Sequence, residues 1–121
     1  MRRLLGVAAA LAVGVSLLAG CSGGSAAFPT GKWTATVWVM DYRSDGTFLL
    51  TDAGTKIDTG TYSTDATTIT FKTDEYCTAV NAEQATYAWQ HANDQLTLTK
   101  QTDSCTDRIG VLDGTAWKPA T

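Results

Sequence analysis

The sequence has few of the residues on which catalysis and metal binding commonly depend. Its 121 residues include one histidine, His91, and three cysteines, Cys21, Cys77 and Cys105. A serine hydrolase needs a histidine base beside its nucleophile, and His91 lies at a predicted strand end with no Gly-x-Ser-x-Gly motif nearby. The single histidine and two thiols provide fewer Cys or His ligands than a zinc site needs. We therefore expect a protein that is not an enzyme, with no catalytic residues, no metal and no cofactor.

Positive charge is also scarce. The formal net charge is −3, and without residues 1–20 the remaining seven Lys and Arg against 12 Asp and Glu give −5. A body with this charge is repelled by nucleic acid and by anionic lipid. No basic stripe with interleaved aromatic residues is present, so we expect no nucleic-acid partner.

Two acidic motifs lack the spacing that their chemistry would require. Asp74 and Glu75 are adjacent, so on an extended chain they point in opposite directions and cannot flank one bond. Residues 41–52 place acids at several positions of a calcium loop, but the third position is Arg43 and the flanks predict strands. We interpret the first motif as solvated loop residues and the second as a hairpin.

Long apolar runs are absent except at the N-terminus. Residues 4–18 carry no charge, follow Met1-Arg2-Arg3 and lead into Ala19-Gly20-Cys21. A positive start, a short apolar segment and small residues at its end are typical of a secretory signal. About 15 apolar residues are too few for a stable membrane span, so we expect a removable export signal.

The end of this signal, Leu18-Ala19-Gly20-Cys21, resembles the lipobox of bacterial lipoproteins. The resemblance implies cleavage before Cys21, whose sulfur would carry a diacylglyceryl group. Two or three acyl chains, with palmitate among them, would hold the protein firmly at the membrane, since each buried CH₂ contributes about 0.8 kcal/mol. The alternatives are an ordinary secretory signal with a chance cysteine, and a twin-arginine signal on Arg2-Arg3.

The lipoprotein interpretation divides the chain into three parts. Residues 1–20 are the lipoprotein signal peptide, residues 21–28 are the lipidated cysteine with a flexible Gly- and Ser-rich tether, and residues 29–118 form one domain. The expected location is the extracytoplasmic side of the bacterial cell membrane or envelope. Cys77 and Cys105 remain as an even pair, 28 positions apart. Outside the cytoplasm such a pair predicts a disulfide, worth about 3–4 kcal/mol on the loop-entropy model.

The domain has an all-β pattern, with frequent Thr, β-branched and aromatic residues and no helical periodicity after residue 28. Predicted strands cover residues 31–40, 47–51, 56–62, 67–73, 85–90, 96–99, 108–112 and 114–118. Trp33, Val37 and Val39 are expected on one face of the first strand, with Trp38 and Met40 on the other. A bulge at Gly60 would bring Ile57 and Tyr62 to one face. Eight short strands with hairpin-length links favour a small antiparallel up-and-down β-barrel, whose closure removes exposed edges.

Gly31-Lys32-Trp33 and the late Arg108 resemble the Gly-x-Trp and late arginine of lipocalins and related calycin barrels. Gly60-Thr61-Tyr62 and Thr86-Tyr87-Ala88-Trp89 are similar to small lipocalin-like domains. The resemblance implies that Trp33 closes one barrel end and that Arg108 packs over its ring as a cation–π pair. This body is much shorter than an ordinary lipocalin, a size that favours an interior filled with side chains.

The aromatic content leaves two hypotheses about function. In the first, the barrel binds a small apolar or amphipathic molecule without catalysis, as aromatic-lined pockets do. Trp38 and Met40 are the best candidate ligand-binding residues, followed by Tyr62, Tyr87 and Trp89. In the alternative, the barrel core is solid and the protein is a surface-exposed structural or protein-interaction module in the envelope.

Overall fold

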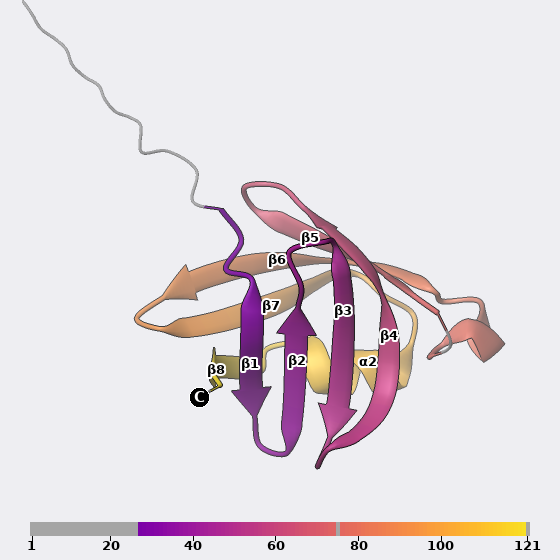
Figure 1. Cartoon of the computed structure of the whole chain (residues 1–121). Coiled ribbons are helices and arrows are strands. Elements are labelled where there is room, and N and C mark those ends of the chain that lie inside the picture. Colours follow the sequence, from indigo (N-terminus) through magenta and orange to yellow (C-terminus); the bar gives the residue numbers. More distant parts are fainter. Residues whose placement is uncertain (1–26, 75, 121) are drawn as a thin grey trace, which may run out of the picture.

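The computed structural model describes residues 27–74 and 76–120, and within them the chain forms a closed antiparallel barrel. Its strands are β1 (Gly31–Ala35), β2 (Trp38–Tyr42), β3 (Thr47–Asp52), β4 (Thr55–Thr64), β5 (Thr68–Thr73), β6 (Gln84–Ala92), β7 (Gln95–Thr102) and β8 (Ala116–Pro119). Each strand pairs with the next and β8 pairs with β1 (Figure 1). The prediction of a small eight-stranded up-and-down barrel is confirmed. The predicted signal peptide and Cys21 lie outside the described residues.

The predicted first strand is in fact a hairpin. Strands β1 and β2 are joined by Thr36 and Val37, and Thr36 adopts a left-handed φ of 54°. Trp33 pairs with Met40 across this turn, and directly opposed residues share one face of a sheet. Placing Trp38 and Met40 on the face opposite to Trp33 was therefore wrong. Met40 lies in the core, whereas Val37 is 54% exposed at the turn.

The predicted strand over residues 108–112 is also wrong, because these residues belong to a helix. Helix α2 (Thr106–Leu112) follows β7 and buries Arg108, Val111 and Leu112. Their spacing of three and four residues matches the buried stripe of a helix. After α2 the chain returns to β7, where the Gly114 backbone N–H donates to the Leu98 carbonyl at 2.8 Å. The number of strands is still eight, because one predicted strand is in fact two strands and another is a helix.

The bulge in β4 lies three residues before the expected position. Leu50 pairs with Asp58 and Thr51 with Lys56, so Ile57 is the extra residue. Gly60 has regular partners on both sides, and a Cβ built there would lie 2.1 Å from the Lys72 carbonyl oxygen. Gly60 is thus explained by the close approach of the β5 backbone. Ile57 and Tyr62 both pack against the core, as the sequence predicts.

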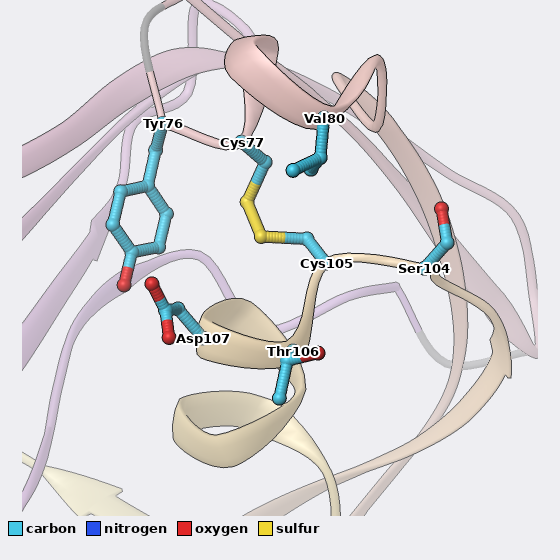
Figure 2. Close-up of a pocket in the computed structure, with 7 residues that line it drawn as sticks. All are labelled: Tyr76, Cys77, Val80, Ser104, Cys105, Thr106 and Asp107. Carbon is cyan, nitrogen blue, oxygen red and sulfur yellow. A yellow bond between two sulfur atoms is a disulfide. The ribbon is translucent and has the colours of Figure 1, made fainter.

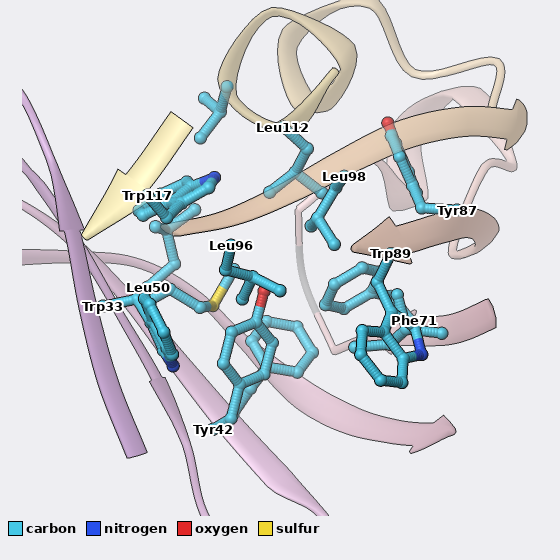
Figure 3. Close-up of a cluster of buried hydrophobic side chains, with 14 of the residues drawn as sticks. Trp33, Tyr42, Leu50, Phe71, Tyr87, Trp89, Leu96, Leu98, Leu112 and Trp117 are labelled. Atoms are coloured by element: carbon cyan, nitrogen blue, oxygen red, sulfur yellow. The ribbon is translucent and has the colours of Figure 1, made fainter. Parts of the chain in front are cut away.

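Side chains fill the inside of the barrel (Figure 3). The largest buried side chains, all less than 2% exposed, are Trp117, Tyr42, Tyr87, Phe48, Phe71, Met40, Ile69, Leu96, Leu98 and Leu112. Their rings pack edge to face, as for Phe48 and Phe71 with centroids 5.5 Å apart. Exposure this low means that these side chains pack closely against one another. The structure therefore has the filled interior that the short chain favours.

Candidate functional site

A pocket lies outside the filled core, where the connection from β5 to β6 meets the start of α2 (Figure 2). That connection contains the short 3₁₀ helix η3 (Thr78–Val80). The pocket has a volume of about 340 Å³ and is lined by Tyr76, Cys77, Val80, Ser104, Cys105, Thr106 and Asp107. We call residues 76–83 together with 103–112 the disulfide end of the barrel.

The predicted disulfide between Cys77 and Cys105 is confirmed and forms part of the pocket wall. Their Cα atoms are 5.7 Å apart, within the range that a disulfide requires. Cys77 precedes η3 with a left-handed φ of 69°, and Cys105 directly precedes α2. The bond therefore ties the β5–β6 connection to the N-terminus of the helix.

A buried ion pair lies beside the disulfide. Arg108 Nε and Nη2 donate to the two carboxylate oxygens of Asp103 at 2.9 and 2.7 Å, and the two side chains are 3% and 0% exposed. Tyr87 Oη donates to the same carboxylate at 2.5 Å, and the Cys105 backbone N–H donates at 2.9 Å. Arg108 Nη2 also donates to the Ala82 carbonyl at 2.7 Å. Because charge-assisted, bidentate bonds are the strong ones, this network fixes α2, β6 and the β5–β6 connection together.

The surroundings of Asp103 affect its ionisation in two opposing ways. Burial by itself would raise the pKa of Asp103, but the hydrogen bonds from Arg108 and Tyr87 outweigh burial and lower this pKa below its usual value. Burial raises the pKa of Tyr87, and the hydrogen bond to Asp103 raises it further. Asp103 is thus a carboxylate at neutral pH, and Tyr87 is a neutral donor to it.

A second acid, Asp58, points inward from β4 and is 4% exposed. Its carboxylate accepts the Thr59 backbone N–H at 2.8 Å. Burial raises the pKa of Asp58 from 3.8 to about 6, although hydrogen bonds from the Thr59 and Tyr76 backbone and the charge of Arg108 act in the opposite direction. Asp58 therefore changes charge closer to neutral pH than an aspartic acid in water does.

The pocket itself combines an apolar wall with an acidic rim. Val80 is 60% exposed beside the disulfide. In Figure 2 the Tyr76 hydroxyl and the Asp107 carboxylate point toward one another at the other side of the pocket. Burial raises the pKa of Tyr76, and the charges of Asp107 and Asp58 raise it further. On α2 the acid Asp107 faces the pocket while its neighbour Arg108 is buried, so the described residues that line the pocket supply a negative charge and no cation.

The residues of the predicted lipocalin signature do not form the expected pair. Trp33 is buried, and its Nε1 donates to the Pro29 carbonyl at 2.9 Å. Its ring packs edge to face with the His91 ring, and the two ring centroids are 5.4 Å apart. Arg108 bonds to Asp103 and to backbone carbonyls instead. These contacts replace the expected packing of Arg108 over Trp33. Gly31, with a φ of 110°, begins β1 in a conformation that favours glycine.

The five predicted ligand-binding residues contribute to the barrel and do not line the disulfide-end pocket. Met40, Tyr87 and Trp89 are buried, and Trp38 and Tyr62 are half-buried against the core. Three of them use their polar atoms internally: Tyr87 Oη donates to Asp103, Tyr62 Oη to the Arg43 carbonyl at 2.6 Å, and Trp89 Nε1 to the Asp65 carbonyl at 3.1 Å. Sequence reasoning missed Tyr76, Val80 and Asp107, although the flanks of the two paired cysteines could have indicated them.

Within residues 27–74 and 76–120, no three His, Cys, Asp or Glu side chains are grouped so that they could hold a metal ion. In the same part of the chain, no helix has the length and apolar character to cross a membrane.

No known protein family matches the chain, and comparison with characterised proteins and with solved structures likewise finds no significant match.

Proposed function

We propose that this protein is an exported, lipid-anchored envelope protein whose filled, lipocalin-like barrel supports non-catalytic binding of a small amphipathic molecule at the disulfide end. The N-terminal pattern that ends in Cys21 supports export and lipid anchoring. The filled interior favours a binding site outside the barrel instead of inside it.

The main support for this site is that the apolar pocket lies where a disulfide and a buried ion pair both cross-link the fold. A disulfide forms part of its wall, and Asp103 and Arg108 hold the adjoining segments in place. A site whose walls are already ordered loses little conformational entropy when a ligand binds. This arrangement favours ligand binding over a solely structural role for the disulfide end.

The charges around the pocket restrict the chemistry of the ligand. Val80 and the disulfide offer an apolar surface, while Asp107 and the Tyr76 hydroxyl offer an anion and a polar group. The whole chain also has a formal charge of −3. We therefore expect an apolar tail with a cationic or hydrogen-bond-donating head, and discrimination against an anionic head.

Calorimetric titration of the full chain tests this site. Dodecyltrimethylammonium should bind below its micelle concentration, and dodecyl sulfate should bind at least tenfold more weakly. Val80→Ser and Asp107→Asn should each weaken binding of the cation several-fold. Val37→Ser is the matched control, because Val37 is a similarly exposed valine at the β1–β2 turn. Equal binding of both detergents, or equal effects of the two valine variants, would contradict the proposed pocket.

The rival function is a protein-interaction or structural module with a solid core. The filled barrel and the exposed Val80 at the pocket support it, since apolar side chains at a surface hollow also suit a protein contact. The calorimetric titration with the two detergents distinguishes the two functions. Absence of binding by either detergent, with the chain folded, would favour the rival.

The lipid anchor is tested separately by labelling cells with radioactive palmitate. The wild-type chain should incorporate label and remain with membranes, whereas Cys21→Ser should do neither. Cys77→Ser is not a suitable control because it breaks the disulfide, so Ser22→Ala serves that purpose. An unlabelled wild-type protein would exclude the anchor and leave the pocket to be judged by its own experiment.

A further inference from the structure

The outer surface of β4 to β7 carries in-register rows of uncharged side chains, most of them polar. One row runs across four strands, because Ser63 pairs with Thr70, Thr70 with Thr86, and Thr86 with Thr102. The hydroxyl oxygens of Thr70 and Thr86 lie 3.3 Å apart. In the next row Thr68 pairs with Ala88, and Ala88 pairs with Thr99.

These rows continue to the end of the β6–β7 hairpin, where Gln90 pairs with Thr97 and Ala92 with Gln95. Together they form what we call the hydroxyl–amide face: Ser63, Thr68, Thr70, Thr86, Ala88, Gln90, Ala92, Gln95, Thr97, Thr99 and Thr102. None of these side chains is charged. The charged residues near the face are Lys72, one row beyond Thr70, Asp94 in the hairpin turn, and Lys118 on β8, two residues beyond Ala116, the partner of Thr97. The side chains of the face itself can therefore form hydrogen bonds only through neutral groups.

This face contains a hollow of its own, separate from the disulfide-end pocket. It has a volume of about 230 Å³ and is lined by Gln90, Ala92, Asn93, Gln95 and Thr97. Asn93 and Asp94 form the tight hairpin turn, with left-handed φ values of 55° and 58°. The β propensity of threonine explains hydroxyls along strands. It does not explain the two glutamines at the hollow, Gln90 and Gln95, because Gln has no such preference, whereas the left-handed turn itself favours Asn at position 93.

The donor and acceptor chemistry of the hollow indicates the class of ligand. Every carboxamide offers two N–H donors and a carbonyl acceptor, and every threonine hydroxyl both donates and accepts. An apolar ligand would leave these groups unpaired, at about 1–3 kcal/mol for each buried group. The residues that line the hollow carry no charge that could pair with a charged ligand. A ligand made of neutral hydroxyl groups meets both conditions, since each sugar hydroxyl also donates and accepts.

We propose that the hydroxyl–amide face is a binding site for a neutral polysaccharide, with sugar units seated in the hollow around Gln90, Gln95 and Thr97. The rows of Ser and Thr extend the site beyond the hollow, so a chain of several sugar units can contact the face. This site is independent of the disulfide-end pocket in both residues and ligand chemistry.

Affinity electrophoresis of the folded full chain, kept soluble with a neutral detergent, tests the proposal. Native gels would contain dextran, a mannan or an arabinogalactan as neutral probes, and hyaluronate as an anionic probe. At least one neutral polysaccharide should retard the wild-type protein, while hyaluronate should not. Because no ion pair is involved, the retardation should persist when the salt concentration is raised.

Matched variants locate the site. The triple variant Gln90→Ala, Gln95→Ala, Thr97→Ala should raise the apparent dissociation constant at least tenfold. Thr55→Ala, at the exposed start of β4, and Val80→Ser, in the other pocket, should leave it unchanged. Normal retardation of the triple variant, or retardation by hyaluronate alone, would overturn the proposal.

Amide chemical shifts of the wild-type protein provide a measurement that does not depend on the folding of any variant. Addition of the retarding polysaccharide should shift the resonances of β6 and β7 around residues 90–97. Shifts confined to residues 76–83, or no binding of any of the three neutral polysaccharides, would exclude the site.

Discussion

The barrel core and the disulfide end are stabilised by different forces. The core contains aromatic and aliphatic side chains, with edge-to-face ring contacts and exposures close to zero. The disulfide end contains a covalent bond and a buried ion pair, and the buried acid Asp58 approaches it from β4, next to the Tyr76 backbone. The stability of the core therefore depends on apolar burial, which responds little to pH or to reductant. The disulfide end should respond to both.

The difference between the two regions also explains why the pocket forms at the disulfide end. Apolar side chains pack until they fill space, so the core leaves no room for a ligand. Buried charges need fixed partners, so Asp103 and Arg108 hold nearby segments in one arrangement. Between these segments a hollow persists, with the disulfide in its wall.

The largest effect is expected from Arg108→Met at the disulfide end. It would leave the Asp103 carboxylate, whose side chain is 0% exposed, without its countercharge. Loss of one partner of a buried pair lowers the free energy of unfolding by about 3–5 kcal/mol. The double variant Asp103→Asn, Arg108→Met should recover part of this loss in chemical denaturation. A single variant that loses less than about 1 kcal/mol would show that the ion pair does not hold this end together.

Removal of the disulfide should have the next largest effect. The double variant Cys77→Ser, Cys105→Ser should lose about 3–4 kcal/mol, since the bond closes a long loop in the unfolded chain. The wild-type melting temperature should fall in dithiothreitol, whereas that of the double variant should not change. Equal melting temperatures of the wild type with and without reductant would disprove the stabilising role of the bond.

Asp58→Asn should change how stability depends on pH. The folded-state pKa of about 6 lies above the ordinary aspartate value of 3.8, so between these values the folded state binds more protons than the unfolded state. The contribution of Asp58 is therefore greatest at acidic pH and is lost as pH rises through about 6. Asparagine cannot titrate, so the difference in unfolding free energy between wild type and variant should change between pH 4 and pH 7. A constant difference over this range would contradict the raised pKa.

The smallest effect is expected from Tyr42→Phe in the core. Tyr42 Oη is buried without a hydrogen-bond partner among the described residues, which is unfavourable for a polar atom. Removal of this hydroxyl should raise the free energy of unfolding by about 1 kcal/mol, equally at pH 5 and pH 8. Tyr87→Phe is the contrasting control, because its hydroxyl bonds to Asp103 and its loss should destabilise the protein. A loss of stability in Tyr42→Phe would indicate that its hydroxyl has a partner such as a buried water.

The alternating pattern of the sequence was sufficient for the fold class and for most strands. It failed at Thr36 and Val37, because this two-residue turn has neither Gly nor Asn and interrupts a run that otherwise reads as one strand. It failed again over residues 108–112, where a short helix with β-branched residues resembles a strand. Each error concerns a short segment in which local preference is weak and packing decides the outcome.

The candidate site was less predictable than the fold. The two cysteines and Arg108 were identified in advance, and the two cysteines were correctly paired with one another. The partner of Arg108 is Asp103, not the predicted Trp33. Such a partner depends on how the β7–α2 connection turns, which the sequence pattern does not describe.

By itself, the amino-acid sequence determined an acidic, all-β body with a single disulfide, because composition, charge and strand alternation are properties of short stretches of chain. Only the tertiary structure decided that the interior is filled, that Arg108 serves a buried carboxylate, and that hollows lie at the disulfide end and on the β6–β7 hairpin. These features arise from contacts between segments distant in sequence, whose geometry is fixed only when the barrel closes and space in its core is filled.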